Sequence, residues 1–229
     1  HLIPIENQSP FGKEKYVTNI IKRTYTITPD GQIEPLPLAD QLEFAGPTPH
    51  DDDSGRSLKY PGDLTDYKPL VDVVINGSAF APEGEPVEAL DVSFELSGLK
   101  KTLRVFGNRR WKRDEEGVIQ KSEPEPFTVM PIRWEKSFGG LRNPWNRLGV
   151  GQDQDHETDP EKPVFSLPNI ENPTDLLRDL DGDVKPVGFS TIPESWEPRF
   201  SLFGTRSAYW ANFRSPLPPK DQDARYANA

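Results

Sequence analysis

The sequence predicts a mainly β fold: antiparallel sheets packed as a sandwich or an open barrel, with long loops and a few short helices. Several stretches alternate apolar and polar residues with a period of two, as in strands with one buried face. Turn-forming Pro, Asp and Gly separate these stretches, and helical patterning is confined to two short segments. With 12 Phe and 5 Trp among 229 residues, we expect a folded domain with an aromatic core.

Two hairpins are predicted most directly. In residues 20–38, Pro29, Asp30 and Gly31 form a turn between two strand-like arms, because Pro presets φ and Gly supplies a positive φ. In residues 88–107, apolar residues alternate on both sides of a turn at Ser97-Gly98. Further strands are expected in residues 70–80 and 126–138, which are rich in β-branched and aromatic side chains.

Helices are expected in residues 173–182 and 204–214. In the first, Thr174 is the N-cap, Gly182 is the stop, and the apolar face comprises Leu176, Leu177 and Leu180. In the second, Thr205 or Ser207 is the cap, and the core-facing residues are Tyr209, Trp210 and Phe213.

Residues 46–67 and 149–163 are acidic, lack a strand pattern and are expected to be long loops. Loops of this length are typically functional or disordered. Since no composition break is sharp, residues 1–229 are expected to form a single domain.

Composition excludes several classes of protein. The chain has no Cys, which excludes disulfide scaffolds, Cys nucleophiles and Cys-zinc sites. Its net charge of -10 disfavours nucleic acid and anionic membranes as partners. No apolar run approaches the roughly 18 residues of a membrane span, and the first residues lack the features of a signal peptide. We therefore expect a soluble protein.

One basic cluster interrupts this acidic chain between residues 100 and 113. Its members are Lys100, Lys101, Arg104, Arg109, Arg110, Lys112 and Arg113. We interpret it as a solvated hairpin whose charges protect a sheet edge. A basic surface for docking a protein is the second interpretation, and a nucleic-acid site is the third.

No metal or cofactor site is expected. Asp179, Asp181 and Asp183 have the alternating spacing of a calcium loop, but Val184 and Ser190 stand where an EF-hand needs Gly and Glu. His50 and His156 lie in the acidic loops, and the sequence has no G-x-S-x-G motif that would place a Ser nucleophile. Hydrolysis by a pair of carboxylates is not excluded by composition, because the chain has 37 Asp and Glu residues. Together with the aromatics, they leave a carbohydrate-binding or carbohydrate-cleaving β-domain as the alternative function.

Residues 133–144 read RWEKSFGGLRNP and raise the question of a phosphate loop. The Gly pair lacks the Gly-Lys-Ser/Thr ending of a Walker loop, and a turn at Asn143-Pro144 follows instead of a helix. We therefore assign Gly139, Gly140, Asn143 and Pro144 to backbone geometry at a corner of the chain.

Seven ordered blocks resemble the family known as domain of unknown function 2169. They are YKPLVDVVINGSAFAP (67–82), LRVFGNRRW (103–111), FTVMPIRWEKSFGGLRNP (127–144), SLPNIENP (166–173), PVGFSTIPESWEPR (186–199), FGTRSAYW (203–210) and DARYANA (223–229). The family pattern Gly-Asp-Arg is here Gly107-Asn108-Arg109, so any role of that Asp is lost. Members of the family generally continue past the position of Asn228-Ala229, so we expect this chain to be either a fragment or a short member.

The resemblance implies a bacterial cytoplasmic protein of the type VI secretion system, without enzymatic activity or cofactor. Such a protein is an adaptor or chaperone that binds a secreted toxin effector and helps load it onto the secretion spike, with a spike-tip protein as a further candidate partner. Interface hot spots favour Trp and Arg, so we predict Arg110, Arg142 and Trp145 as partner contacts. Trp111 and Trp134 are predicted to lie in the core.

Overall fold

The computed structural model describes residues 2–8, 15–52, 56–63, 73–141, 143, 145–151 and 165–191. The chain divides into two compact units, each described by itself below. Unit 1 comprises His1–Thr48, Tyr60–Val71 and Phe200–Ala229, and unit 2 comprises Pro49–Lys59 and Asp72–Arg199.

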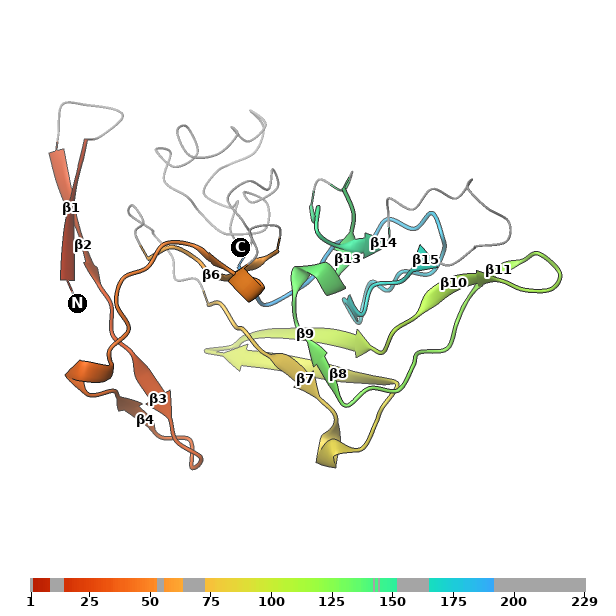
Figure 1. The fold of residues 1–229 in the computed structure, drawn as a ribbon, viewed down its shortest axis with the longest axis horizontal. Helices are drawn as coiled ribbons and strands as arrows, with labels where there is room; N and C mark the ends of the chain where they lie inside the picture. Colours follow the sequence, from red (N-terminus) through yellow and green to blue (C-terminus); the bar gives the residue numbers. More distant parts are fainter. Residues whose placement is uncertain are drawn as a thin grey trace. The chain divides into compact units, whose positions relative to one another are not determined.

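Unit 1 contains two antiparallel strand pairs (Figure 1). Strand β1 (Leu2–Gln8) pairs with β2 (Lys15–Ile21), and β3 (Tyr25–Ile27) pairs with β4 (Ile33–Pro35) before the 3-10 turn η1 (Leu38–Asp40). The turn between β3 and β4 lies where the sequence predicts it. Gly31 has a φ of 83°, a conformation that suits Gly.

A short paired segment follows within the stretch expected to be a loop. Strand β5 (Thr48–Pro49) and strand β6 (Leu58–Tyr60) form a two-stranded sheet, and the 3-10 turn η2 (His50–Asp52) lies between them. The prediction of a loop without strands over residues 46–67 is therefore wrong at these positions. The backbone N–H of His50 donates to the carbonyl of Ser57 at 2.9 Å, which closes the segment.

The main element of unit 2 is the predicted hairpin, formed by β8 (Ala89–Leu96) and β9 (Leu99–Phe106) (Figure 1). Ser97 and Gly98 have positive φ at its turn, as the sequence predicts. Strand β16 (Ile170–Glu171) extends this sheet on the free side of β9. A second sheet pairs β7 (Ser78–Phe80), which precedes the 3-10 turn η3 (Pro82–Gly84), with β12 (Val129–Pro131).

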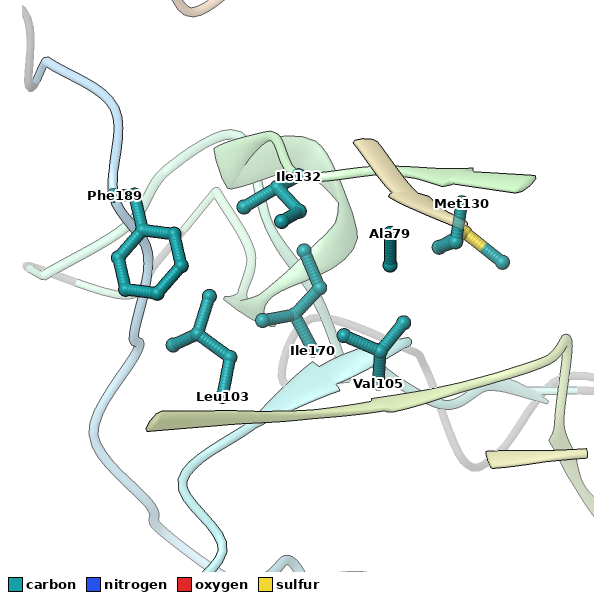
Figure 2. Close-up of a cluster of buried hydrophobic side chains, with 7 residues drawn as sticks. All are labelled: Ala79, Leu103, Val105, Met130, Ile132, Ile170 and Phe189. Carbon is teal, nitrogen blue, oxygen red and sulfur yellow. The ribbon is translucent and has the colours of Figure 1, made fainter. Parts of the chain in front are cut away.

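The larger core of unit 2 lies between these two sheets. Figure 2 shows Leu103 and Val105 projecting from β9 toward the side chains on the opposite layer. The buried cluster comprises Ala79, Leu103, Val105, Met130, Ile132, Ile170 and Phe189. In the second half of β9, the buried Leu103 and Val105 alternate with half-buried Thr102, Arg104 and Phe106, so burial there follows the period of two in the sequence. The structure confirms a mainly β, antiparallel fold, and its described part contains no closed barrel.

A smaller core in unit 2 is built on β10 (Arg110–Arg113). This strand pairs with β11 (Ile119–Lys121) and β15 (Phe165–Ser166). After the 3-10 turn η4 (Trp134–Lys136), β13 (Phe138–Gly139) runs parallel to β14 (Val150–Gly151). The buried members of this core are Trp111, Phe138, Leu167, Leu177 and Val184.

The helix predicted over residues 173–182 is wrong. Asn172 Oδ1 accepts hydrogen bonds from the backbone N–H of Thr174 at 3.1 Å and from its hydroxyl at 2.9 Å, so Thr174 does not cap a helix. The N–H of Leu177 donates to Glu171 Oε2 at 2.7 Å instead of to a helical carbonyl. Side-chain acceptors thus replace the helical ladder, although Leu177 is buried as expected.

Other expectations hold only in part. Of residues 70–80, the structure places Ser78–Phe80 in a strand, and of residues 126–138 it places Val129–Pro131 and Phe138 in strands. Helices in the described part of the chain are three-residue 3-10 turns. The helix predicted over residues 204–214 and residues 152–163 of the second loop lie outside the described residues.

Candidate functional site

A pocket of about 340 Å³ opens in unit 2 beside the start of β10. Its lining comes from four segments: the β9–β10 link with the start of β10, the turn η4, strand β14, and the end of β15 with the stretch after it. The residues are Asn108, Arg109, Arg110, Glu135, Lys136, Val150, Ser166, Leu167 and Asn169. The volume is at the lower end of the range of small-ligand sites, and most of the lining residues are polar or charged.

Arg109 forms a buried part of this lining. Its guanidinium forms an ion pair with Glu171, donates to the carbonyl of Pro168 at 2.7 Å and stacks over the ring of Phe106, 3.6 Å from the centroid. Burial lowers the pKa of Arg109, and the neighbouring Glu171 carboxylate opposes that shift. The interpretation of Arg109 as part of a solvated hairpin is therefore wrong, because a buried carboxylate pairs with it.

Arg110 lies at the exposed rim of the pocket. Its Nη2 is 3.2 Å from Glu125 Oε1, and both side chains are about half exposed. Its backbone N–H donates to Ser122 Oγ at 3.1 Å, which holds the strand in place. An exposed ion pair contributes about 0–1 kcal/mol, so the guanidinium can exchange this carboxylate for another acceptor at little cost.

Two Asn side chains fix the wall next to Arg110. Asn169 Nδ2 donates to the carbonyl of Phe106 and to Asn108 Oδ1, each at 3.2 Å. Asn108 Nδ2 in turn donates to Glu125 Oε2 at 3.3 Å. The wall is thus a chain of hydrogen bonds that ends at the carboxylate paired with Arg110.

The turn η4 forms another part of the lining. Glu135 accepts hydrogen bonds from Ser57, through the backbone N–H at 2.7 Å and the hydroxyl at 2.8 Å. The carbonyl of Lys136 accepts from the backbone N–H of Asn169 at 2.8 Å. Lys136 forms no ion pair with any residue that the structure describes. Lys136 is half-buried and is a cationic residue of the lining, as Arg110 is.

The Gly corner lies directly after η4 and is rigid. Gly139 has a φ of 157°, and a Cβ there would lie 2.1 Å from the carbonyl oxygen of Asn146. Asn146 Nδ2 donates to the carbonyls of Trp134 at 2.8 Å and Phe138 at 3.0 Å. Asn143 Oδ1 accepts from the backbone N–H groups of Trp145 at 2.7 Å and Asn146 at 3.0 Å. These contacts support the assignment of Gly139 and Asn143 to backbone geometry.

The three predicted partner contacts lie in different places. Arg110 lines the pocket. Trp145 is half-buried, with the Lys185 ammonium 5.8 Å from its ring centroid, and it is not among the lining residues. Arg142 lies outside the described residues, as does Pro144. Trp111 and Trp134 are buried, which confirms their placement in the core.

Sequence reasoning missed most of the pocket. Lys136 lies 26 positions after Arg110, and Ser166 and Asn169 lie more than 50 positions after it, so no spacing rule connects them to Arg110. One indication of the pocket is present in the sequence: most of its lining residues lie in three blocks of the family resemblance. These blocks are LRVFGNRRW, FTVMPIRWEKSFGGLRNP and SLPNIENP.

His50, considered for catalysis, is 7% exposed, and its Nε2 has no hydrogen-bond partner among the described residues. Burial lowers the pKa of His50, and the positive charge of Arg133 lowers it further. Among the described residues, no cluster of three or more His, Asp or Glu could hold a metal ion. In the same part of the chain, no helix is long and apolar enough to cross a membrane.

Comparison with known proteins gives a family match. The model of a family described as an uncharacterized protein conserved in bacteria (DUF2169) matches residues 12–229. No curated protein matches the chain, and no solved structure matches it.

Proposed function

This chain belongs to the DUF2169 family, and we propose that it is a non-catalytic adaptor or chaperone of the bacterial type VI secretion system. In this role it binds a toxin effector in the cytoplasm and helps load it onto the secretion spike. The proposal is supported by the seven ordered sequence blocks, which run through most of the chain.

The observation that carries the proposal is the position of Arg110 at the rim of a pocket with fixed walls. Asn169 donates hydrogen bonds to two backbone carbonyls of the pocket walls, those of Phe106 and Lys136. The turn η4 is also fixed by the hydrogen bond from the backbone N–H of Ser57 to Glu135. A surface that is already ordered loses little conformational entropy when a partner binds. Arg110 offers oriented donors on that surface, and Arg side chains are enriched among interface hot spots.

Trp145 gives a second contact in the same proposal. The hydrogen bond from its backbone N–H to Asn143 fixes the loop, while the half-buried indole remains accessible on one side. Large aromatic side chains lose few rotamers on binding and bury much area. Arg142 completes the set of proposed contacts.

The test is co-expression of this chain with the secreted protein encoded beside its gene, followed by size-exclusion chromatography. A stoichiometric complex supports the adaptor function. If no complex forms and the isolated chain binds glycans, the function is that of a carbohydrate-binding or carbohydrate-cleaving β-domain instead. Glycan arrays and assays of reducing-sugar release distinguish binding from cleavage.

A further inference from the structure

The β3–β4 hairpin of unit 1 has one entirely apolar face. The pairs Tyr25–Pro35 and Ile27–Ile33 lie directly opposite each other across the strands, two residues apart, so their side chains share one side of the sheet. The intervening pair, Thr26–Glu34, lies on the other side. We call Tyr25, Ile27, Ile33 and Pro35 the hairpin face.

This face is exposed to solvent. Tyr25 is 51% exposed, Ile27 73% and Ile33 68%, and Pro35 is exposed as well. Other apolar side chains of the same segment are also exposed: Ile21, Leu38 and Leu42. Contiguous exposed apolar side chains on a folded protein typically mark an interaction site.

The hairpin is nevertheless held in place by its own hydrogen bonds. Gln41 Oε1 accepts from the N–H of Thr24 at 2.7 Å, and Gln41 Nε2 donates to the carbonyl of Leu36 at 2.5 Å. Thr24 Oγ1 accepts from the N–H of Leu42 at 3.0 Å. Gln41 and Thr24 therefore close the open end of the hairpin, while Gly31 shapes the turn at its other end. The apolar face is a preorganised surface.

The segment that carries the face is mainly acidic. Residues 22–43 contain four carboxylates and two basic side chains. Of the two basic groups, Lys22 is held by Asp63 at 2.6 Å and by the carbonyl of Glu43, also at 2.6 Å, and Arg23 lies 5.7 Å from the ring centroid of Tyr25. The carboxylates are Asp30, Glu34, Asp40 and Glu43. A complementary partner therefore has apolar side chains flanked by Lys or Arg.

We propose that the hairpin face is the docking surface for a segment of the effector polypeptide in which apolar side chains are flanked by basic residues. This inference rests on the proposed adaptor function and assigns the partner's chemistry. The apolar contact supplies most of the affinity, and the acidic surroundings select a basic partner and speed its association.

The experiment uses the full chain and, as the probe, the secreted protein encoded beside its gene. The double variant Ile27→Thr/Ile33→Thr keeps β-branched side chains in both strands but removes apolar surface from the face. The matched control is Leu99→Thr, which changes an apolar residue of similar exposure (65%) in the turn region of the β8–β9 hairpin. Affinities are measured by isothermal titration calorimetry, and circular dichroism checks that each variant folds.

We expect the double variant to weaken binding about tenfold or more, while Leu99→Thr changes the affinity less than about twofold. A second variant, Glu34→Lys/Asp40→Lys, is expected to lower the association rate and reduce its dependence on salt. It does not touch the apolar face, so it tests the charge of the partner even if the Thr variant is less stable.

The outcomes separate the two proposals. A wild-type complex whose affinity is unchanged by Ile27→Thr/Ile33→Thr and by Glu34→Lys/Asp40→Lys overturns the hairpin inference and leaves the adaptor function standing. No complex with the wild-type chain overturns both. If the isolated chain is dimeric in sedimentation velocity and the double variant is monomeric, the face binds a second copy of this chain, and the inference is overturned.

Discussion

The carboxylate of Glu171 joins two segments of unit 2 by its two oxygens. Oε1 pairs with the buried guanidinium of Arg109, and Oε2 accepts the backbone N–H of Leu177 at 2.7 Å. Arg109 and Glu171 are 8% and 1% exposed at their side chains, so neither charge is solvated by water. The Glu171 side chain therefore neutralises the buried charge of Arg109. It also accepts the backbone N–H of Leu177, which in a helix would donate to a main-chain carbonyl.

Replacing Glu171 with Gln should strongly destabilise the protein. The variant keeps the shape of the side chain but leaves the Arg109 charge buried without a counter-ion, at a cost of about 3–5 kcal/mol. Urea denaturation followed by Trp fluorescence measures the loss. The control is Asp91→Asn, which breaks the exposed ion pair with Arg104 and should cost less than about 1 kcal/mol. Equal losses in the two variants would contradict the role given to the buried pair.

Replacing Gly139 with Ala should destabilise the corner after η4. The added Cβ would lie 2.1 Å from the Asn146 carbonyl, and the backbone of both segments would have to shift. We expect a loss of about 1–3 kcal/mol, as for other overpacked sites, seen as a lower midpoint in thermal unfolding. Gly46→Ala is the control, since a Cβ there meets nothing within 4 Å. A Gly139→Ala protein as stable as Gly46→Ala would show that the corner is not tightly packed.

The buried His50 should make stability depend on pH. Burial lowers its pKa in the folded state below the value of 6.5 for an unperturbed His, so below that pH the unfolded chain binds the proton more readily. The free energy of unfolding is therefore highest above pH 6.5 and falls as the pH drops from 6.5 toward the folded pKa. The slope from this residue is at most about 1.4 kcal/mol per pH unit.

This dependence is checked by urea denaturation between pH 7.5 and 5.5 for the wild type and His50→Gln. The difference in unfolding free energy between the two proteins should become smaller as the pH falls, because only the wild type loses this contribution. A difference that is constant with pH would mean that His50 titrates equally in both states.

Arg110→Gln should weaken partner binding without affecting the fold. The side chain is about half exposed and its one ion pair contributes little, so the unfolding free energy should change by less than about 0.5 kcal/mol. Its loss from the pocket rim should lower the affinity for the co-expressed effector about tenfold. Arg104→Gln removes another exposed, ion-paired Arg and is the matched control. Equal affinity for both variants would remove Arg110 from the interface.

The hairpins could be predicted from the sequence because their determinants are local. Alternation in β8 and β9 and the turn residue Gly31 act on neighbours in the chain, so no distant contact is needed to recognise them. The same local reasoning placed Trp111 and Trp134 in the core, where large aromatic side chains of a β-rich chain bury most area.

The errors arose where distant residues decide the outcome. The segment that follows Glu171 has the apolar spacing of a helix, but the orientation of that carboxylate is set by Arg109, 62 positions earlier. For the same reason, a charge count could not show that Arg109 is buried and Arg110 exposed. The pocket joins segments from Asn108 to Asn169, and its lining depends on tertiary packing alone.

The fully buried side chain of Asn146 is a point where a single chemical change would disturb unit 2. Its amide nitrogen donates to two main-chain carbonyls. Hydrolysis of this amide to a carboxylate would replace that donor by an acceptor and turn both attractions into repulsions. The packing that fixes this corner also keeps water away from the amide carbon of Asn146, so it protects the two hydrogen bonds against this change.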